Sequence, residues 1–321
     1  MLPDIKRNGS PFSGLSIIAM KEAADHMTSK RVHLVMLLVV MAGLGAIFSS
    51  IGQIKATIGQ DEFLFLRLFT TANNPLPSFV AFMGFLLPLV AIALGFDAIN
   101  GEYSRRTMPR LLAQPIYRDA VLTGKFLGGL MVLAICLLTL WLLMTGLGIL
   151  TLGLPPSSEE VLRGLAYLIC CLAYGAVWLA LALLFSAVLR SPATSALAAL
   201  TLWLISTVFW PMIAPGLASI VAPVDPFDPA SLIAYAEWLQ VMKRISPATL
   251  YSEMTLALMS PETRSLGLVF LEQYSGAVPG SPLPFSQSSL LIWPHLAGLI
   301  AGVMLVFTLA YVSFQRQEAR S

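Results

Sequence analysis

Six long runs without a charged residue limit this chain more than any other feature. The runs cover residues 32–54, 68–96, 126–158, 164–189, 191–224 and 290–315. Each run can hold about 20 apolar residues as a helix, which is enough to cross a hydrocarbon core of roughly 30 Å. Strands of membrane barrels instead alternate between apolar and polar residues over segments of about 10. The sequence therefore predicts an all-α integral membrane protein with six transmembrane helices.

The composition excludes a soluble enzyme. Hydrophobic residues make up 57% of the chain, charged residues only 11%, and the mean hydropathy is +0.80, values typical of membrane proteins. The runs contain no ionisable residue at mid-membrane depth that would suit an acid, a base or a proton relay. Cys136, Cys170 and Cys171 lie within the runs, and we expect them to act as small apolar residues, not as metal ligands.

The sequence also lacks the motifs that bind nucleotides and nucleic acids. Gly124-Lys125 superficially resembles a phosphate-binding loop, but that loop needs a Gly where Asp119 stands and a Ser or Thr where Phe126 stands. There is no basic patch with interleaved aromatic residues, which nucleic-acid binding would need. We therefore expect no cofactor, no metal, no catalytic residue and no nucleic-acid partner on this chain.

The distribution of Lys and Arg predicts the orientation, because short cytoplasmic segments beside membrane helices carry an excess of these residues. With the N-terminus inside, 13 of the 19 lie on the cytoplasmic side. These are Lys6, Arg7, Lys21, Lys30, Arg31, Arg105, Arg106, Arg110, Arg118, Lys125, Arg190, Arg316 and Arg320. Both termini are therefore expected in the cytoplasm, with the chain crossing the cytoplasmic membrane several times.

The N-terminal part, residues 1–31, is predicted to be a cytoplasmic tail that includes an amphipathic surface helix. Between residues 12 and 31, apolar and polar positions recur at helical spacing. One face of that helix carries Leu15, Ile18, Ala19, Glu22 and His26. Basic residues at its end would hold it beside anionic lipid headgroups, or would simply fix the orientation of the first transmembrane helix.

Residues 223–289 are proline-rich and predict a small helical cap on the outer face, between the fifth and sixth transmembrane helices. Ser246-Pro247 and Ser260-Pro261 each have the pattern of a helix start, with a capping Ser followed by Pro in the first turn. The cap is either a lid over the helix ends or a surface for an external partner. The remaining divisions are 32–222, which holds transmembrane helices one to five, and 290–321, which holds the sixth helix and a cytoplasmic tail.

Small residues and prolines predict how the membrane helices pack. Glycine pairs four residues apart let helices approach closely. The pairs are Gly124 with Gly128 and Gly298 with Gly302. Pro88 in the second helix, and Pro211 and Pro215 in the fifth, each remove a backbone hydrogen bond and are expected to kink those helices.

Residues 97–125 form a charged segment between the second and third transmembrane helices. The segment is too long for a tight turn and predicts two short helices. The first should end near Gln114, because Pro115 disfavours helical geometry in the residue before it. Asp119 should cap the second. From these residues alone, a rigid corner that contacts a soluble partner and a positive loop that only sets the orientation are both open.

The same segment resembles the intracellular signature of the ABC-2-type permeases of bacterial and archaeal ABC transporters, including the permeases of nitrous-oxide-reductase maturation. The matching positions are Asp97, Glu102, Thr107, Leu111-Leu112, Gln114-Pro115, Arg118 and Gly124-Lys125. Arg106 departs from the pattern, which often has Gly before the Thr. The resemblance extends to Lys21-Glu22, to Ser29-Lys30-Arg31 and to Leu189-Arg190-Ser191.

This resemblance implies a permease subunit in the cytoplasmic membrane of a prokaryote, paired as a homodimer with two copies of a separate ATP-binding subunit. ATP and Mg would be bound by that partner, which would drive substrate movement. Residues 102–114 would form a coupling helix that docks in a groove of the partner. The residues assigned to this contact are Glu102, Arg105, Arg106, Thr107, Arg110, Leu111, Gln114, Pro115 and Arg118.

A second hypothesis comes from a different class of protein. The chain would be a membrane scaffold or sensor that transports nothing and recruits an external protein through residues 223–289. A scaffold needs no ATP-binding partner, so the two hypotheses differ in which protein is bound and on which side of the membrane.

Overall fold

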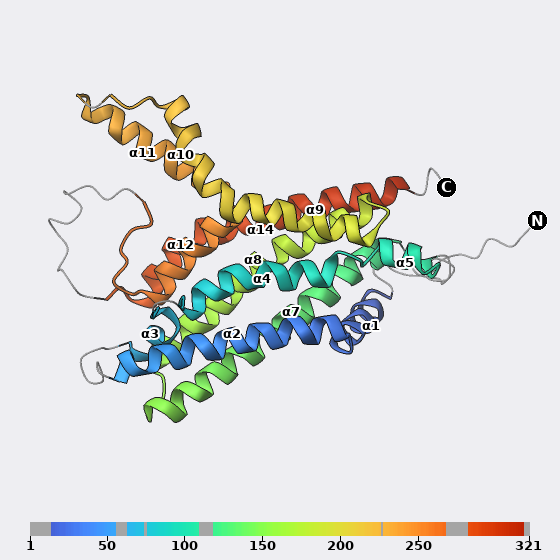
Figure 1. Cartoon of the computed structure of the whole chain (residues 1–321), viewed down its shortest axis with the longest axis horizontal. Helices are drawn as coiled ribbons and strands as arrows, with labels where there is room; N and C mark the ends of the chain where they lie inside the picture. Colours follow the sequence, from blue (N-terminus) through green and yellow to red (C-terminus); the bar gives the residue numbers. More distant parts are fainter. Residues whose placement is uncertain are drawn as a thin grey trace, which may run out of the picture.

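The computed structural model describes residues 14–55, 63–73, 76–108, 118–225, 227–267 and 282–317. Within these ranges the regular elements are all helices (Figure 1). They are α1 Leu15–Met27, α2 Lys30–Lys55, α3 Leu64–Thr70, α4 Phe79–Gly95, α5 Asn100–Ser104, α7 Arg118–Leu152, α8 Ser158–Val188, α9 Pro192–Leu204, the π-helix η1 Ile205–Phe209, α10 Trp210–Val221, α11 Pro229–Lys243, α12 Pro247–Met259 and α14 Phe285–Gln317.

Six helical stretches are long and apolar enough to cross a membrane, which confirms the predicted number. They are Lys30–Lys55, Phe79–Ser104, Arg118–Leu152, Ser158–Val188, Pro192–Val221 and Phe285–Arg316. α1 and the end of α14 lie at one end of the bundle, and α3 and α12 lie toward the other (Figure 1). We call these the α1 end and the α12 end.

The core is built around α8, which packs against α4, α7, α12 and α14. In α8, 61% of the most apolar window is buried, against 11% in Pro192–Val221 and 11% in Phe285–Arg316. Cys136, Cys170 and Cys171 are unpaired and lie in this core, where they fill space as small apolar side chains. The outer faces of α9, α10 and α14 are therefore left to lipid or to another protein.

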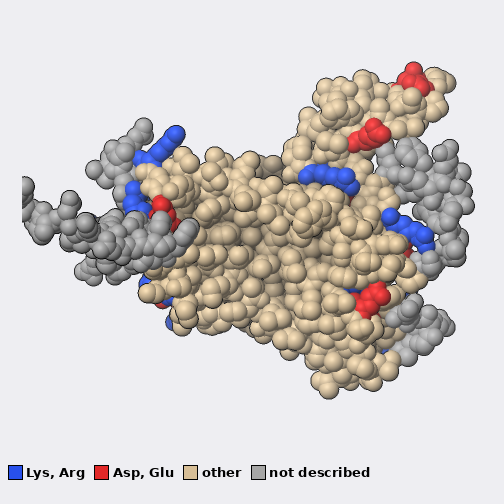
Figure 2. Space-filling model, turned by 180° about the vertical axis from the view of Figure 1, so that it is seen from behind, with Lys and Arg blue, Asp and Glu red and all other residues tan. Residues whose placement is uncertain are grey.

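Charged residues gather toward the two ends of the molecule, and a wide band between them carries none on the face that Figure 2 shows. Two charged side chains are nevertheless buried at the α12 end. Glu160 accepts a hydrogen bond from the Phe65 backbone N–H at 2.7 Å and forms a capping box with Ser157 at the start of α8. Arg163, one turn further on, has no exposed surface at all.

The second membrane helix begins later than the charge-free run 68–96 suggested. The run opens within α3, which ends at Thr70, and α4 starts only at Phe79. Asn73 and Leu76 pair with each other in an isolated bridge between the two helices. Pro77 disfavours helical geometry at Leu76, and the Ser78 hydroxyl then caps α4 by accepting from the Ala81 N–H.

The fifth membrane helix is interrupted, as its prolines predicted. Pro211 has no N–H to donate to the carbonyl of Thr207, four residues before it. Directly ahead of this proline the helix widens into the π turn η1, where the Trp210 N–H donates to the Ile205 carbonyl, five residues back. Beyond η1, α10 diverges from the bundle and pairs with α11 (Figure 1). Pro88 lies inside α4, which continues through it as one helix.

The segment expected to form an outer cap has two different halves. α11 contains no buried residue and packs mainly on α10, whereas α12 buries Tyr251, Met254 and Leu258 against the bundle. Ser246-Pro247 starts α12, as predicted, with the Ser246 hydroxyl accepting from the Ala248 N–H. The prediction of a helix start at Ser260-Pro261 was wrong, because α12 ends at Met259 and the chain turns there, the Thr263 N–H donating to the Ser260 carbonyl.

Candidate functional site

A buried lysine joins three helices at the α1 end. Lys125, on α7, is only 3% exposed. Its Nζ lies 2.8 Å from Glu22 Oε1 on α1 and 3.4 Å from Glu102 Oε1 on α5. Burial lowers the pKa of the neighbouring His26, because it disfavours the charged imidazolium. We call Glu22, Glu102 and Lys125 the charge cluster.

Close packing of α1 on α7 brings Glu22 to Lys125. A Cβ atom at Gly124 would lie 2.6 Å from Ile18 Cγ2, and one at Gly128 would lie 2.7 Å from Glu22 Cβ. The glycine pair therefore lets the two backbones approach, as the sequence predicted. The N-terminal segment is helical, as predicted, and Glu22 lies on the face of α1 that packs against α7. In the second pair, Gly298 and Gly302, a Cβ atom would meet nothing closer than 3.5 Å within the described part of the chain.

Replacing Gly128 with Leu should push α1 off α7. The added side chain would overlap Glu22 Cβ and the Ala19 carbonyl, and the latter is backbone that cannot move aside cheaply. We expect faster proteolysis within residues 15–27 and a lower melting temperature in detergent. Gly146→Leu on the same helix is the matched control, because a Cβ atom there meets nothing within 4 Å. Equal proteolysis of the two variants would contradict the packing role of Gly128.

The segment after α4 is held against the C-terminal end of α8. The Ser186 hydroxyl accepts hydrogen bonds from the Ile99 and Asn100 N–H groups at 2.9 and 3.2 Å, and so caps α5 from another helix. Asn100 Nδ2 donates to the Leu189 carbonyl at 3.2 Å. Asp97, two residues beyond the end of α4, accepts a 2.7 Å hydrogen bond from Arg31 Nη2. The start of the segment is therefore held in place by the end of α8 and by Arg31 on α2.

The turn that follows α5 is held by Glu102 and contains a strained residue. The Thr107 hydroxyl donates to the Glu102 carboxylate, and the Thr107 N–H donates to the Glu102 carbonyl at 3.0 Å. Between them Arg106 has φ +56°, in the left-handed region that disfavours side chains with a Cβ. This is the position where the resembling family often has Gly. Gly adopts this conformation most readily, and Arg106 adopts it at a cost.

Arg106→Gly should therefore stabilise the turn, by about 1 kcal/mol on the usual difference between Gly and other residues in this conformation. Arg106→Ala removes the same guanidinium but keeps the strain, so it is the matched comparison. The check is the free energy of unfolding of the two variants in mixed micelles. An Arg106→Gly protein no more stable than Arg106→Ala would contradict the strain.

The predicted contact residues fall into three groups. Arg105 and Arg106 are exposed, and Glu102 and Thr107 form the turn beneath them. Arg118 lies over the Phe314 ring at 5.1 Å and donates to the Phe314 carbonyl at 3.2 Å, so it ties α7 to α14. The other four, Arg110, Leu111, Gln114 and Pro115, lie outside the described residues.

Two local predictions about this segment were wrong. The first expected helix is not continuous, because α5 ends at Ser104 and Arg106 leaves the helical region, with helical geometry again at Met108; its expected end near Gln114 lies outside the described residues. α7 starts at Arg118, so Asp119 lies in its first turn and does not cap it. Asp119 Oδ1 instead accepts from the Tyr311 hydroxyl at 3.0 Å and from Gln315 Nε2 at 2.5 Å. Both contacts come from α14, 192 and 196 residues away, and no local pattern shows them.

The structure brings together positions that lie far apart in the resembling pattern. Glu22 meets Lys125, Arg31 meets Asp97, and Leu189 meets the start of α5. None of these contacts was predicted from the sequence. The signal that could have suggested the two ion pairs is a carboxylate and a basic residue on predicted cytoplasmic segments, Glu22 with Lys125 and Asp97 with Arg31.

Comparison with known proteins identifies the family. The family described as ABC-2 family transporter protein matches residues 16–319. The chain belongs to the ABC-2 family of transporter proteins. It is 27% identical over 306 residues to a probable ABC transporter permease protein NosY of Stutzerimonas stutzeri, covering 94% of this chain and 97% of that protein. It is 30% identical over 303 residues to a probable ABC transporter permease protein NosY of Pseudomonas aeruginosa, with the same coverage.

Membership of this family shows what kind of subunit the chain is. It is a permease, a non-catalytic and multi-pass membrane component of an ABC transporter, from a family typical of the cytoplasmic membrane. Membership implies partnership with an ATP-binding subunit. Within the ranges given above, no group of three or more His, Cys, Asp or Glu side chains is arranged to hold a metal ion.

Proposed function

We propose that this chain moves a substrate across the cytoplasmic membrane, driven by ATP that a separate subunit hydrolyses with Mg. The charge cluster is the observation that carries the proposal. Through Lys125 it connects the turn after α5 to α1 and to the long membrane helix α7. A push on this turn from the cytoplasm would therefore reach three helices as one rigid unit.

Within the segment 97–125 the residues have different proposed roles. Arg105 and Arg106 are exposed and would meet acidic groups of the ATP-binding subunit. Glu102 and Thr107 would shape the turn that presents them, since both are bonded within the chain. Arg110, Leu111, Gln114 and Pro115 are proposed to complete the contact, and Arg118 to fix its end on α14.

The proposed assembly is two copies of this chain and two of the ATP-binding subunit, with both termini in the cytoplasm. The concentration of Lys and Arg at the α1 end supports that orientation. The exposed outer faces of the fifth and sixth membrane stretches leave surface for a second copy and for membrane lipids. Residues 223–289 would then lie outside, where α11, which has no buried residue, is available to an external protein.

Removing the two exposed guanidinium groups tests the contact. The variants Arg105→Ala and Arg106→Ala should stay folded and inserted, and should bind less ATP-binding subunit. Lys243→Ala is the control, because it removes a basic side chain from the last turn of α11, away from the α1 end. The measure is the amount of ATP-binding subunit that co-purifies per copy of the chain. Undiminished recruitment in both Arg variants would reject this placement of the contact.

Glu102→Ala should also reduce recruitment, but by a different route. It removes the acceptor of the Thr107 hydroxyl and one partner of Lys125, so the turn itself should loosen. Unlike the exposed arginines, it should also lower the melting temperature of the isolated chain. A variant that loses recruitment with no change in melting would place Glu102 in the contact itself.

A further inference from the structure

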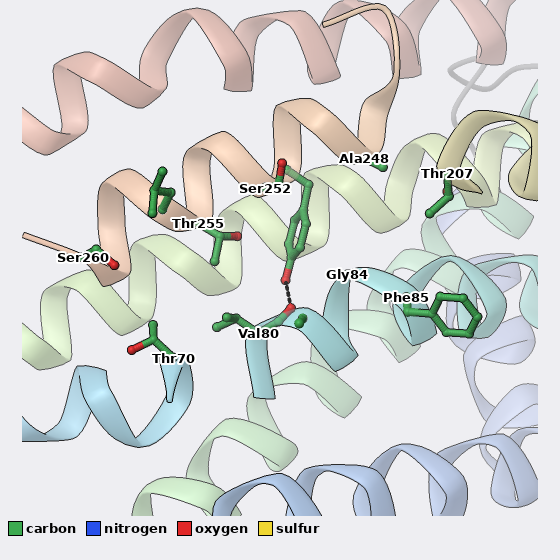
Figure 3. A pocket seen from close by; sticks show the side chains of 12 residues that line it. Thr70, Val80, Gly84, Phe85, Thr207, Ala248, Ser252, Thr255 and Ser260 are labelled. Atoms are coloured by element: carbon green, nitrogen blue, oxygen red, sulfur yellow. Dashed lines mark hydrogen bonds between the residues drawn. The ribbon is translucent and has the colours of Figure 1, made fainter. Parts of the chain in front are cut away.

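A cavity of about 500 Å³ lies between α4, η1 and α12, on the α12 side of the bundle. This volume falls within the range of about 300–1,000 Å³ that is usual for small-molecule sites. Phe85 and Thr207 lie toward one end of it and Thr70, Thr255 and Ser260 toward the other (Figure 3). The described residues that line it are all uncharged.

One wall of the cavity is preformed by a buried tyrosine. The Tyr251 ring stacks on Tyr174 with centroids 4.6 Å apart, and its hydroxyl lies 2.7 Å from that of Tyr167. The same hydroxyl donates to the Val80 carbonyl at 3.2 Å, the dashed line in Figure 3. A Cβ atom at Gly84 would lie 2.9 Å from Tyr251 Cε1, so only glycine lets the ring lie this close to α4.

Two hydroxyl groups at the cavity are buried and make no hydrogen bond within 3.5 Å among the described residues; each interacts only weakly with a tyrosine, Thr255 with Tyr251 and Thr207 with Tyr174. Thr255 is 6% exposed, and Thr207 lies in the middle of η1. Buried polar groups are nearly always paired, and those that are not call for an explanation. π turns such as η1 occur frequently at functional sites. Two hydroxyls without a close partner, in an uncharged and mainly apolar cavity, point to a ligand that supplies a stronger hydrogen bond.

We propose that this cavity binds one neutral amphiphilic molecule. The apolar body of the molecule would lie against Phe85 and Leu256, and its hydroxyl or carbonyl group would hydrogen-bond to Thr255 or Thr207. A charged molecule is disfavoured because no lining residue would balance its charge. Bilayer lipids and lipophilic molecules in transit across the membrane both combine an apolar body with a hydroxyl or carbonyl group. This site goes beyond the proposed coupling to ATP and does not depend on it.

Photolabelling of the full chain in nanodiscs tests the site, with a diazirine-bearing octanol as the probe. Adducts should map to residues 79–95 or 247–259. Ser252→Phe should lower labelling at least about fivefold, because Ser252 lines the cavity and is exposed, so a larger side chain fills space without disturbing the core. The matched control is Ser219→Phe on α10, which is exposed and does not line the cavity. Equal labelling of the two variants would overturn the proposal.

Thr255→Val and competitors test the chemistry of the ligand. Loss of one hydrogen bond should weaken competition by unlabelled octanol about fivefold. Octanoate at pH 8 should compete poorly, and competition equal to that of octanol would overturn the assignment of a neutral ligand. Labelling that rises when lipid is removed identifies a resident lipid, and labelling that is insensitive to lipid identifies a molecule in transit. Both of these results support the neutral amphiphile, and neither measurement involves the ATP-binding subunit.

Discussion

The Lys125→Met variant should lose about 3–5 kcal/mol of its free energy of unfolding, which is the usual cost of removing one partner from a buried ion pair. The lysine side chain is 2% exposed and its carboxylate partners Glu22 and Glu102 are 9% and 20% exposed, so solvent offers them little compensation. The check is unfolding in mixed micelles of increasing SDS content, compared with Lys55→Met, which changes an exposed lysine at the end of α2.

A double variant separates charge from packing in this prediction. Glu22→Gln with Lys125→Met removes the carboxylate that Lys125→Met leaves buried and unpaired. It should therefore be more stable than Lys125→Met alone. If the double variant is less stable by the sum of the two single changes, Glu22 and Lys125 do not act as a pair, and the charge cluster does not hold α1 to α7.

The Arg163→Leu variant should lose a similar amount, about 3–5 kcal/mol, for a related reason. Arg163 is fully buried in α8 and donates hydrogen bonds to four partners. It donates to Glu159, to the Leu258 carbonyl, to the Ser288 hydroxyl and to the Leu283 carbonyl. Those contacts join α8 to the end of α12 and the start of α14, so their loss should loosen the whole α12 end.

A conservative replacement and a distant one test this role. Arg163→Lys should recover only part of the stability, because one ammonium group cannot reproduce the planar set of donors. Arg316→Leu is the control, as this arginine is exposed in the last turn of α14. A fall in melting temperature for Arg163→Leu no larger than that for Arg316→Leu would contradict the role of Arg163 in joining these elements.

The contrast between Lys125 and Arg163 shows what the sequence could and could not predict. The six membrane helices follow from local hydrophobicity, and close packing at Gly124 and Gly128 follows from glycines four residues apart, although α1 was not predicted as the partner. Arg163 stands between two apolar runs and is one of the six Lys and Arg that the predicted orientation leaves on the external side. Its burial depends on carbonyl groups 95 and 120 residues away, which no window of the sequence contains.

Residues 97–125 also combine features that the sequence could predict with features that it could not. The resemblance selected Glu102, Thr107 and Lys125 as positions of interest, and the structure places the three in one network. The coupling helix expected over 102–114 is interrupted near its start, because α5 is capped by Ser186, 87 residues from Ile99 along the chain, and because Arg106 takes a left-handed conformation; its part beyond 108 lies outside the described residues. Both effects depend on tertiary contacts or on backbone geometry and not on helix propensity.

The most direct test of the central claim is to purify the chain from its native membrane in mild detergent and to measure the mass and stoichiometry of what accompanies it. We predict an ATP-binding subunit at equal copy number, present with the native chain and reduced in the Arg105→Ala and Arg106→Ala variants. Reproducible absence of an ATP-binding subunit, with an external protein bound instead, would contradict the proposed transport function and favour a membrane scaffold.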